Sequence, residues 1–331
     1  MKKLFSFAAI VAATCVAFSC NRIETPQMEA SQTLPVVTKS FMDKNPIMAV
    51  YVETNDVNPL NAGDYEISEM PLFDIVELFA ANIHKETVGG QVRPTLYLND
   101  KLTNVLENGG AATYVQPLQN MGIKVLLTVL GDWQHIGVAN MDDTQSTQFA
   151  KILAYTVNKY GLDGIGFDDE YADYQGSLVS DSYSKIITKL HALLPADKII
   201  TVFDWGNTSQ INSAASACID YAYHGYFGSY VTNSNITGMT AAKWSPVSFN
   251  LGNYNSSSTA QTNASKALNG SYGAMMCFNL RTRNDNDPLP VFQGLANGAY
   301  YGATVTCSNG NRPRTAGSVY GGYTINYAMA Q

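Results

Sequence analysis

Eight short apolar runs recur along the chain, and predicted helices lie between several of them. The clearest run, Ile123–Leu130, is almost continuously apolar, which is typical of a strand buried on both faces of a parallel sheet. The clearest amphipathic helix is expected after it, over Thr144–Tyr160. This alternation predicts an α/β fold, a single (β/α)8 TIM barrel. The predicted strands lie in the runs 47–53, 73–83, 123–130, 160–171, 198–205, 218–227, 246–251 and 272–280.

Further helices are expected over 113–121, 183–194 and 289–300. The short run Thr95–Asn99 is set aside as a possible hairpin insertion, and the run 73–83 also allows a helix because it contains Leu and Ala.

Three consecutive acids end the fourth predicted strand. Alternate side chains of a strand share a face, so Asp168 and Glu170 would point the same way as Gly166, and Asp169 the opposite way. The Cα atoms of Asp168 and Glu170 would lie roughly 6–7 Å apart, close enough for both carboxyls to reach one sugar ring and to influence each other's pKa. The spacing alone also fits a strand end that runs out into a solvated acidic loop.

Polar or aromatic residues follow strand after strand. In a (β/α)8 barrel the active site lies at the carboxyl ends of the strands, so these positions are expected to surround it. Each one alone could equally cap a strand. The positions are Glu53, Asn82, Asp132, Trp133, Asp168, Glu170, Asp204, Trp205, Tyr226, Asn250 and Asn279.

The run Leu162–Tyr174 resembles the signature of glycoside hydrolase family 18, Asp-Gly-x-Asp-x-Asp-x-Glu, in the form found in its endo-β-N-acetylglucosaminidase branch. The resemblance to this branch extends to three other segments, Val129–Gly131, Asp220–Ala222 and Gly273–Leu280, which are similar to other strands of the family. The resemblance implies hydrolysis of the GlcNAc-β-1,4-GlcNAc core of N-linked glycans, with no cofactor and no metal. Chitin is a less expected substrate, because the Asp-Asp-Glu-Tyr form of the motif is that of the endoglycosidase branch.

The resemblance also assigns roles to residues. The substrate's own 2-acetamido group would be the nucleophile, as in other substrate-assisted retaining glycosidases. Glu170 would be the general acid and then the base, Asp168 would orient the acetamido group, and Tyr226 would hydrogen-bond its carbonyl oxygen. The residues expected to contact the sugar are Trp133, Trp205, Tyr223, Phe227 and Asn279, with core packing as the alternative for each aromatic residue.

One position departs from the signature, because Gly166 stands where the family has its middle Asp. Without that neighbour, Asp168 is expected to ionise more readily and to be less firmly oriented. Two outcomes are open: hydrolysis at a reduced rate, or a catalytically weak glycan-binding surface lipoprotein that uses the same cleft. Restoring the acid with Gly166→Asp is expected to raise activity.

The amino end resembles a bacterial lipoprotein signal. Two lysines precede an apolar stretch that ends in Ala17-Phe18-Ser19-Cys20 and is too short to span a bilayer comfortably. We expect residues 1–20 to be this signal, Cys20 to be lipidated, residues 21–45 to be a flexible tether and residues 46–331 to be the glycosidase domain. The alternative is an ordinary cleaved signal. The lipid would anchor the protein in the bacterial cell envelope, at the outer membrane, beside glycan-uptake proteins.

Charge and motif content argue against other classes of protein. The chain has 20 Lys and Arg against 27 acids, and the signal contains two lysines and no acid, which leaves 18 basic residues and a net charge of about −9. Such a balance disfavours nucleic acid as a partner. The four histidines are scattered without a His-Glu-x-x-His motif, and no Gly-x-Ser-x-Gly elbow indicates a serine hydrolase.

Overall fold

The computed structural model describes residues 44–253 and 256–331. The predicted signal with Cys20, and all but the last two residues of the predicted tether, lie outside the described residues, so the domain boundaries stay predictions. Over the described ranges, no helix combines the length and apolar character needed to cross a membrane.

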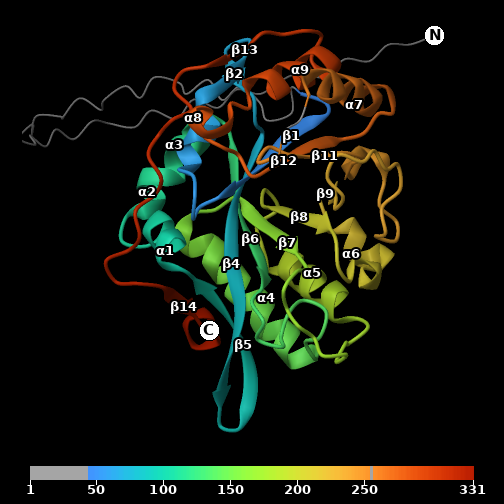
Figure 1. Ribbon diagram of the computed structural model, residues 1–331. Coiled ribbons are helices and arrows are strands. Elements are labelled where there is room, and N and C mark those ends of the chain that lie inside the picture. Colours follow the sequence, from blue (N-terminus) through green and yellow to red (C-terminus); the bar gives the residue numbers. More distant parts are fainter. Residues whose placement is uncertain (1–43, 254–255) are drawn as a thin grey trace, which may run out of the picture. The chain divides into compact units, whose positions relative to one another are not determined.

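Parallel strands form a nearly closed barrel, which confirms the predicted (β/α)8 fold (Figure 1). The strands β1, β4, β6, β7, β8 and β9 pair in this order, and β12 pairs with β1 from the other side. The barrel strands are β1 (Ile47–Glu53), β4 (Ile75–Val88), β6 (Lys124–Gly131), β7 (Gly164–Asp168), β8 (Ile199–Asp204), β9 (Tyr221–His224), β10 (Trp244–Ser245), β11 (Ser248–Asn250) and β12 (Ala274–Phe278).

The predicted seventh strand is divided into two short strands, which form the two ends of the barrel sheet. β10 pairs with β9, and β11 pairs with β12, both in parallel register. Pro246 and Val247 separate them. Proline has no backbone N–H to donate to a neighbouring strand, which explains why the strand is interrupted there.

Side chains of the barrel strands fill two separate apolar layers. Ile47, Ala49 and Tyr51 of β1 point into the barrel, whereas Met48 and Val50 point out toward the helices. Both faces of each strand are therefore buried, which is why the strands are continuous apolar runs in the sequence. The inner layer consists of Ile47, Ala49, Tyr51, Ile75, Leu126, Ile199, Phe203, Tyr223, Ala274 and Met276.

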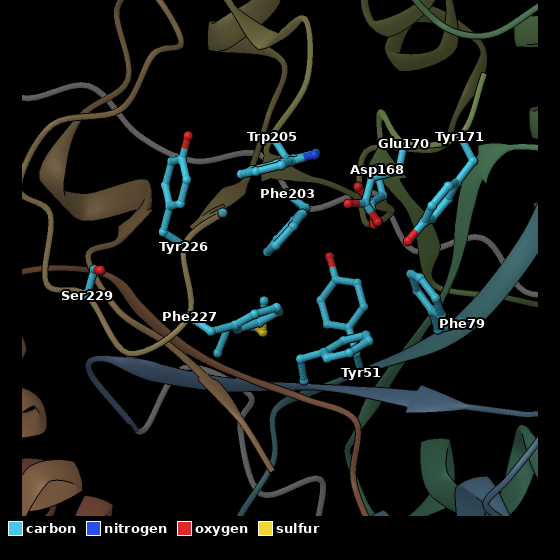
Figure 2. A pocket seen from close by; sticks show the side chains of 13 residues that line it. Tyr51, Phe79, Asp168, Glu170, Tyr171, Phe203, Trp205, Tyr226, Phe227 and Ser229 are labelled. Carbon is cyan, nitrogen blue, oxygen red and sulfur yellow. The ribbon is translucent and has the colours of Figure 1, made fainter. Parts of the chain in front are cut away.

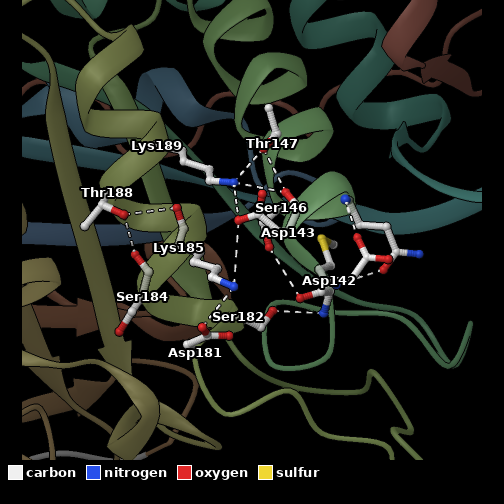
Figure 3. Close-up of polar contacts among 12 residues, drawn as sticks. Asp142, Asp143, Ser146, Thr147, Asp181, Ser182, Ser184, Lys185, Thr188 and Lys189 are labelled. Atoms are coloured by element: carbon white, nitrogen blue, oxygen red, sulfur yellow. Dashed lines mark hydrogen bonds and ion pairs between the residues drawn. The ribbon is translucent and has the colours of Figure 1, made fainter.

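Helix α4 (Asp143–Tyr160) is set by strong local signals. Asp142 and Gln145 form a capping box at its start, and Gly161 ends it with a left-handed φ of 64°. On the outer surface, Lys189 of α5 (Ser182–Leu193) donates to Asp143 Oδ1 at 2.8 Å and to Thr147 of α4 (Figure 3). These exposed contacts fix the relative position of the two helices more than they add stability.

The remaining helices follow the other strands. The α-helices are α1 (Asp100–Leu106), α2 (Gly110–Tyr114), α3 (Gln116–Asn120), α6 (Ser213–Ala217), α7 (Ser257–Asn269), α8 (Arg283–Asn286) and α9 (Leu289–Ala299), and short 3₁₀ helices occupy Pro59–Asp64, Thr208–Gln210, Ala241–Lys243 and Tyr327–Ala330. The predicted helix 113–121 is broken into α2 and α3, because Pro117 suits the first turn of a helix and not its interior.

The first two crossovers depart from a regular barrel. After β1 the chain forms β2 (Tyr65–Ile67) and β3 (Met70–Pro71) with no α-helix. β4 continues beyond the barrel and pairs antiparallel with β5 (Gln91–Leu98), which confirms the hairpin insertion suggested by the run Thr95–Asn99.

The carboxyl-terminal tail packs against these irregular elements. Its strand β13 (Val305–Cys307) pairs with β2, and β14 (Tyr323–Ile325) pairs with β5. Arg312 forms an ion pair with the buried carboxyl of Asp64 at 2.7 Å. The tail therefore covers sheet edges that the missing first helix leaves open.

Candidate active site

A cavity of about 510 Å³ opens at the carboxyl ends of the barrel strands (Figure 2). Its wall is mainly aromatic, and among the described residues the carboxylic acids that line it are the two that share a face of the acidic strand. The lining residues are Tyr51, Phe79, Asp168, Glu170, Tyr171, Phe203, Trp205, Gly225, Tyr226, Phe227, Ser229, Met276 and Phe278.

The three acids after Phe167 divide as strand alternation predicts. Asp168 ends β7, and its carboxyl and that of Glu170 both point into the cavity (Figure 2). Asp169 faces the other way, where it accepts hydrogen bonds from the hydroxyl of Tyr174 and, at 2.8 Å each, from the backbone N and Nδ2 of Asn207. Asp169 therefore ties the loop that carries Glu170 to the end of β8.

Asp168 lies in surroundings that favour its protonated form. It is 3% exposed, and its Oδ1 has no hydrogen-bond partner within the described part of the chain. Burial raises the pKa of Asp168 well above its usual value, and the charges of Glu170, Asp169 and Glu77 raise the pKa further. This direction is opposite to the easier ionisation expected from the sequence, because that expectation left out burial and the carboxyl of Glu77.

Glu170 has the properties of a general acid. Its side chain is half-buried, burial raises its pKa, and the charge of Asp169 adds to the rise. A raised pKa favours the protonated carboxyl, which can deliver its proton to a leaving oxygen in the cavity.

The predicted tyrosine lies on the opposite side of the cavity from the acids. Tyr226 is 57% exposed, its ring packs edge-on against Trp205 with centroids 4.9 Å apart, and the width of the cavity separates it from Asp168 (Figure 2). A different tyrosine, Tyr51 on β1, directs its buried hydroxyl toward the acids (Figure 2). Sequence reasoning missed Tyr51, although its position two residues before Glu53 places it on the inward face of β1.

Some of the residues predicted to contact the sugar line the cavity, and others do not. Trp205 and Phe227 line the cavity. Trp133 is 63% exposed on the rim, outside the lining, and packs against Tyr171 with ring centroids 5.9 Å apart. Asn279 also lies outside the lining, where its Oδ1 accepts a hydrogen bond from Arg281 at 2.9 Å.

Tyr223 belongs to the barrel core. It is 0% exposed and packs edge-on against Tyr51, with ring centroids 6.0 Å apart. A side chain with no exposed surface cannot stack on a sugar, so that prediction is wrong, and core packing is the correct alternative.

Aromatic residues that the sequence reasoning did not select form much of the cavity wall. Phe227 stacks on Phe203 and on Phe278 at centroid distances of 5.8 and 5.3 Å, and Phe278 packs edge-on against Phe79 at 5.5 Å. The signal for three of them was present in the sequence, since Phe79, Phe203 and Phe278 each occupy an inward position near the end of a strand. Such a wall can bury the apolar face of a ligand while the acids engage its polar groups.

The other polar residues at strand ends are used to hold loops. Asp204 accepts hydrogen bonds from Ser234 Oγ at 2.7 Å and from the backbone N of Asn235 at 2.8 Å, which fixes the loop after β9. Asp132 contacts His84 Nε2 at 2.7 Å and joins the β4–β5 hairpin to the end of β6. These residues cap strands, as the alternative interpretation of the sequence allowed.

The fold and the site together define a class of protein. A (β/α)8 barrel whose fourth predicted strand presents two carboxyls with raised pKa values to an aromatic cavity at its carboxyl end has the construction of a glycoside hydrolase.

Curated relatives identify the family within that class. The chain is 34% identical over 270 residues to an endo-β-N-acetylglucosaminidase of Flavobacterium sp. (strain SK1022), covering 79% of this chain and 82% of the relative. It is 33% identical over 278 residues to endo-β-N-acetylglucosaminidase F1 of Elizabethkingia meningoseptica, covering 78% and 79%. The chain belongs to the family of these bacterial endo-β-N-acetylglucosaminidases. No protein-family model matches it.

Solved structures agree with this assignment. EndoBT-3987 of Bacteroides thetaiotaomicron, crystallised with a Man5GlcNAc product, superposes with a TM-score of 0.71 at 28% identity, over 84% of this chain and 66% of that one. A family 18 chitinase of Pseudoalteromonas aurantia shares the fold, with a TM-score of 0.51 at 15% identity over 76% of this chain and 99% of that one.

Proposed function

We propose that the protein hydrolyses the β-1,4 bond between the two core GlcNAc residues of N-linked glycans and leaves one GlcNAc on the protein. The observation that carries this proposal is the placement of Asp168 and Glu170 in one aromatic cavity, each with a raised pKa. Membership of the family supports the choice of bond. The structure of EndoBT-3987 in complex with a Man9GlcNAc2Asn substrate supports the choice of glycan.

The proposed mechanism uses these side chains in two steps. In the first, Glu170 gives its proton to the glycosidic oxygen while the carbonyl oxygen of the substrate's 2-acetamido group attacks the anomeric carbon. Asp168 orients that acetamido group and, as an anion, stabilises the positive charge that develops on it. In the second step, Glu170 takes a proton from the water that opens the cyclic intermediate. Tyr226 would reach the acetamido group only if its side chain turned inward, and Tyr51 is already directed there.

The test is to incubate the protein with a glycoprotein that carries one high-mannose chain and to measure the masses of the products by mass spectrometry. We expect the protein product to retain a single GlcNAc. Glu170→Gln is the control. It should lower the rate of cleavage by about 10²–10⁴-fold while the protein stays folded. Intact glycoprotein that stays bound to wild-type protein, with no mass loss above that of Glu170→Gln, would support the binding lipoprotein instead.

We further propose that a lipid on Cys20 anchors the protein in the cell envelope, at the outer membrane. The support is the sequence alone, where two lysines, a short apolar stretch and small residues precede Cys20. Cells fed a labelled fatty acid should label wild-type protein and leave Cys20→Ala unlabelled. Equal labelling of the two proteins would exclude this attachment site.

A further inference from the structure

A second buried carboxyl lies inside the barrel, on a strand other than the one that bears the motif. Glu77 is on β4 and is fully buried. Its Oε2 accepts a hydrogen bond from Thr128 of β6 at 2.9 Å, and its Oε1 accepts one from Thr201 of β8. Among the described residues, no basic side chain forms an ion pair with it. A buried acid held only by hydroxyls is costly to a fold, which indicates a purpose beyond packing.

The carboxyl of Glu77 occupies the space beside Gly166. A Cβ placed on Gly166 would lie 2.3 Å from Glu77 Oε2 and 2.9 Å from both Glu77 Cδ and Thr201 Oγ1. Gly166 has Thr128 on one side in the sheet and Thr201 on the other, the same two residues that hold Glu77. The glycine and the glutamate are therefore complementary, because any larger side chain at position 166 would force Glu77 out of its place between the two threonines.

Glu77 also acts on Asp168, which lies two residues after Gly166 on the same inward face of β7. Asp168 has a buried Oδ1 without a hydrogen-bond partner among the described residues, and the charge of Glu77 is one cause of its raised pKa. Burial raises the pKa of Glu77 itself to about 7. The other titratable groups that Glu77 influences are Tyr51 and Tyr223, whose pKa values burial raises well above the ordinary value, so both remain neutral.

We propose that Glu77 is a positioning residue that supplies from β4 the carboxyl that the signature normally places at position 166. Its negative charge, held beside Gly166 on the inward face of β7, favours the positive charge that develops on the substrate's acetamido group. This inference rests on the proposed function and names a residue outside the motif that the function requires.

The first test compares Glu77→Gln with wild type on a high-mannose glycopeptide between pH 4 and 9. The glutamine is almost isosteric but carries no charge. We expect kcat at the wild-type optimum to fall about tenfold or more, with KM changed less than about threefold. The acidic limb of kcat should move to lower pH, because the charge of Glu77, which raises the pKa of Asp168, is removed.

The matched control is Asp74→Asn. Asp74 is another buried carboxyl, with a pKa raised by burial to about 6, and it accepts a hydrogen bond from the backbone N of Met48, at the start of β1 and away from the cavity. It should lose thermal stability while keeping the wild-type pH profile. If Glu77→Gln keeps the wild-type kcat and the wild-type acidic limb, Glu77 is a structural residue and the inference is wrong. A wild type that does not cleave would overturn the proposed function and this inference together.

The second test moves the carboxyl between strands. Gly166→Asp alone should lose activity, contrary to the expectation from the signature, because the new side chain collides with Glu77. The double variant Glu77→Ala with Gly166→Asp should have a kcat at least about tenfold higher than that of Gly166→Asp alone. A double variant no more active than Gly166→Asp would contradict the exchange of one carboxyl for the other.

Discussion

Asp168, Asp169 and Glu170 are consecutive acids, yet their surroundings give them different chemical states. Asp168 is buried and has a strongly raised pKa, Glu170 is half-buried with a raised pKa, and Asp169 is held as a hydrogen-bond acceptor on the other side of the strand. The difference arises from strand alternation, which sends neighbours to opposite faces. One short stretch can therefore provide both the acids and the anchor for the loop that carries them.

The alkaline limb of activity should report the proton on Glu170. A general acid works only while protonated, so kcat/KM is expected to fall as pH rises through the raised pKa of Glu170. Asp169→Asn removes a charge that raises this pKa and should move the limb to lower pH. Asp173→Asn, in the same loop, is the control and should leave the limb in place. A limb that Asp169→Asn does not move would show that another group controls it.

The free energy of unfolding should depend on pH through the titration of Glu77. Its folded-state pKa of about 7 exceeds the unfolded value near 4.5, so its contribution is fully present below pH 4.5 and is lost as pH rises to 7. The loss is on the order of 3 kcal/mol. Glu77→Gln should therefore flatten the decline in the free energy of unfolding across this window, measured by urea denaturation at a series of pH values. An unchanged slope would mean that Glu77 titrates alike in both states.

At the scale of elements, the end of β6 positions the acid loop. The backbone N–H of Gly131 donates to the carbonyl of Glu170 at 3.0 Å. A Cβ on Gly131 would lie 2.5 Å from the backbone of Ala172 and 2.7 Å from the carbonyl oxygen of Glu170. Only glycine permits this approach of two loops, so the position of Glu170 depends on a residue of the preceding strand.

Gly131→Ala should therefore displace the acid. We expect kcat to fall by at least about tenfold with the barrel still folded, because small displacements of a catalytic group are costly. Gly176→Ala is the control, because it lies in the loop after β7 with open space around its Cβ, while its φ of 78° strains an alanine. It should lose some stability and leave kcat unchanged. Wild-type kcat in Gly131→Ala would show that the loop can move without consequence.

At the scale of the whole molecule, the tail replaces the helix that is missing after β1. Besides its ion pair with Arg312, the buried carboxyl of Asp64 accepts hydrogen bonds from Ser308 Oγ at 3.1 Å and from the backbone N of Gly310 at 3.0 Å. These partners all come from the tail. The last residues are therefore part of the barrel domain and complete its buried polar contacts.

Deleting residues 303–331 should destabilise the domain strongly. The deletion exposes the edges of β2 and β5 and leaves the buried Asp64 without these partners, which is expected to cost at least about 3 kcal/mol. Thermal unfolding measures this loss. Val319→Ala, a substitution at an exposed tail position, should have no effect. A deletion variant with the melting temperature of wild type would show that the barrel does not need the tail.

The sequence by itself determined the architecture and the location of the acids. Strand and helix periodicities are local, and each barrel strand is buried on both faces, so the apolar runs identified all eight positions in the ring. The motif around Asp168 is also contiguous, and strand alternation alone gave its inward and outward sides. Local patterns did not predict the interruption of the seventh strand. Pro246 divides that run into β10, which pairs with β9, and β11, which pairs with β12.

Only the tertiary structure decided the environment of the acids. In the sequence, Gly166 indicates only the loss of a carboxyl from the motif. In the structure β4 and β7 flank β6, and Glu77 of β4 fills the space beside Gly166 in the barrel interior. Tyr51 and Tyr223 have similar sequence surroundings, yet one lines the cavity and the other lies beneath it. The reason is physical: pKa, burial and steric fit depend on distances between strands that are remote in the chain, and no local pattern encodes those distances.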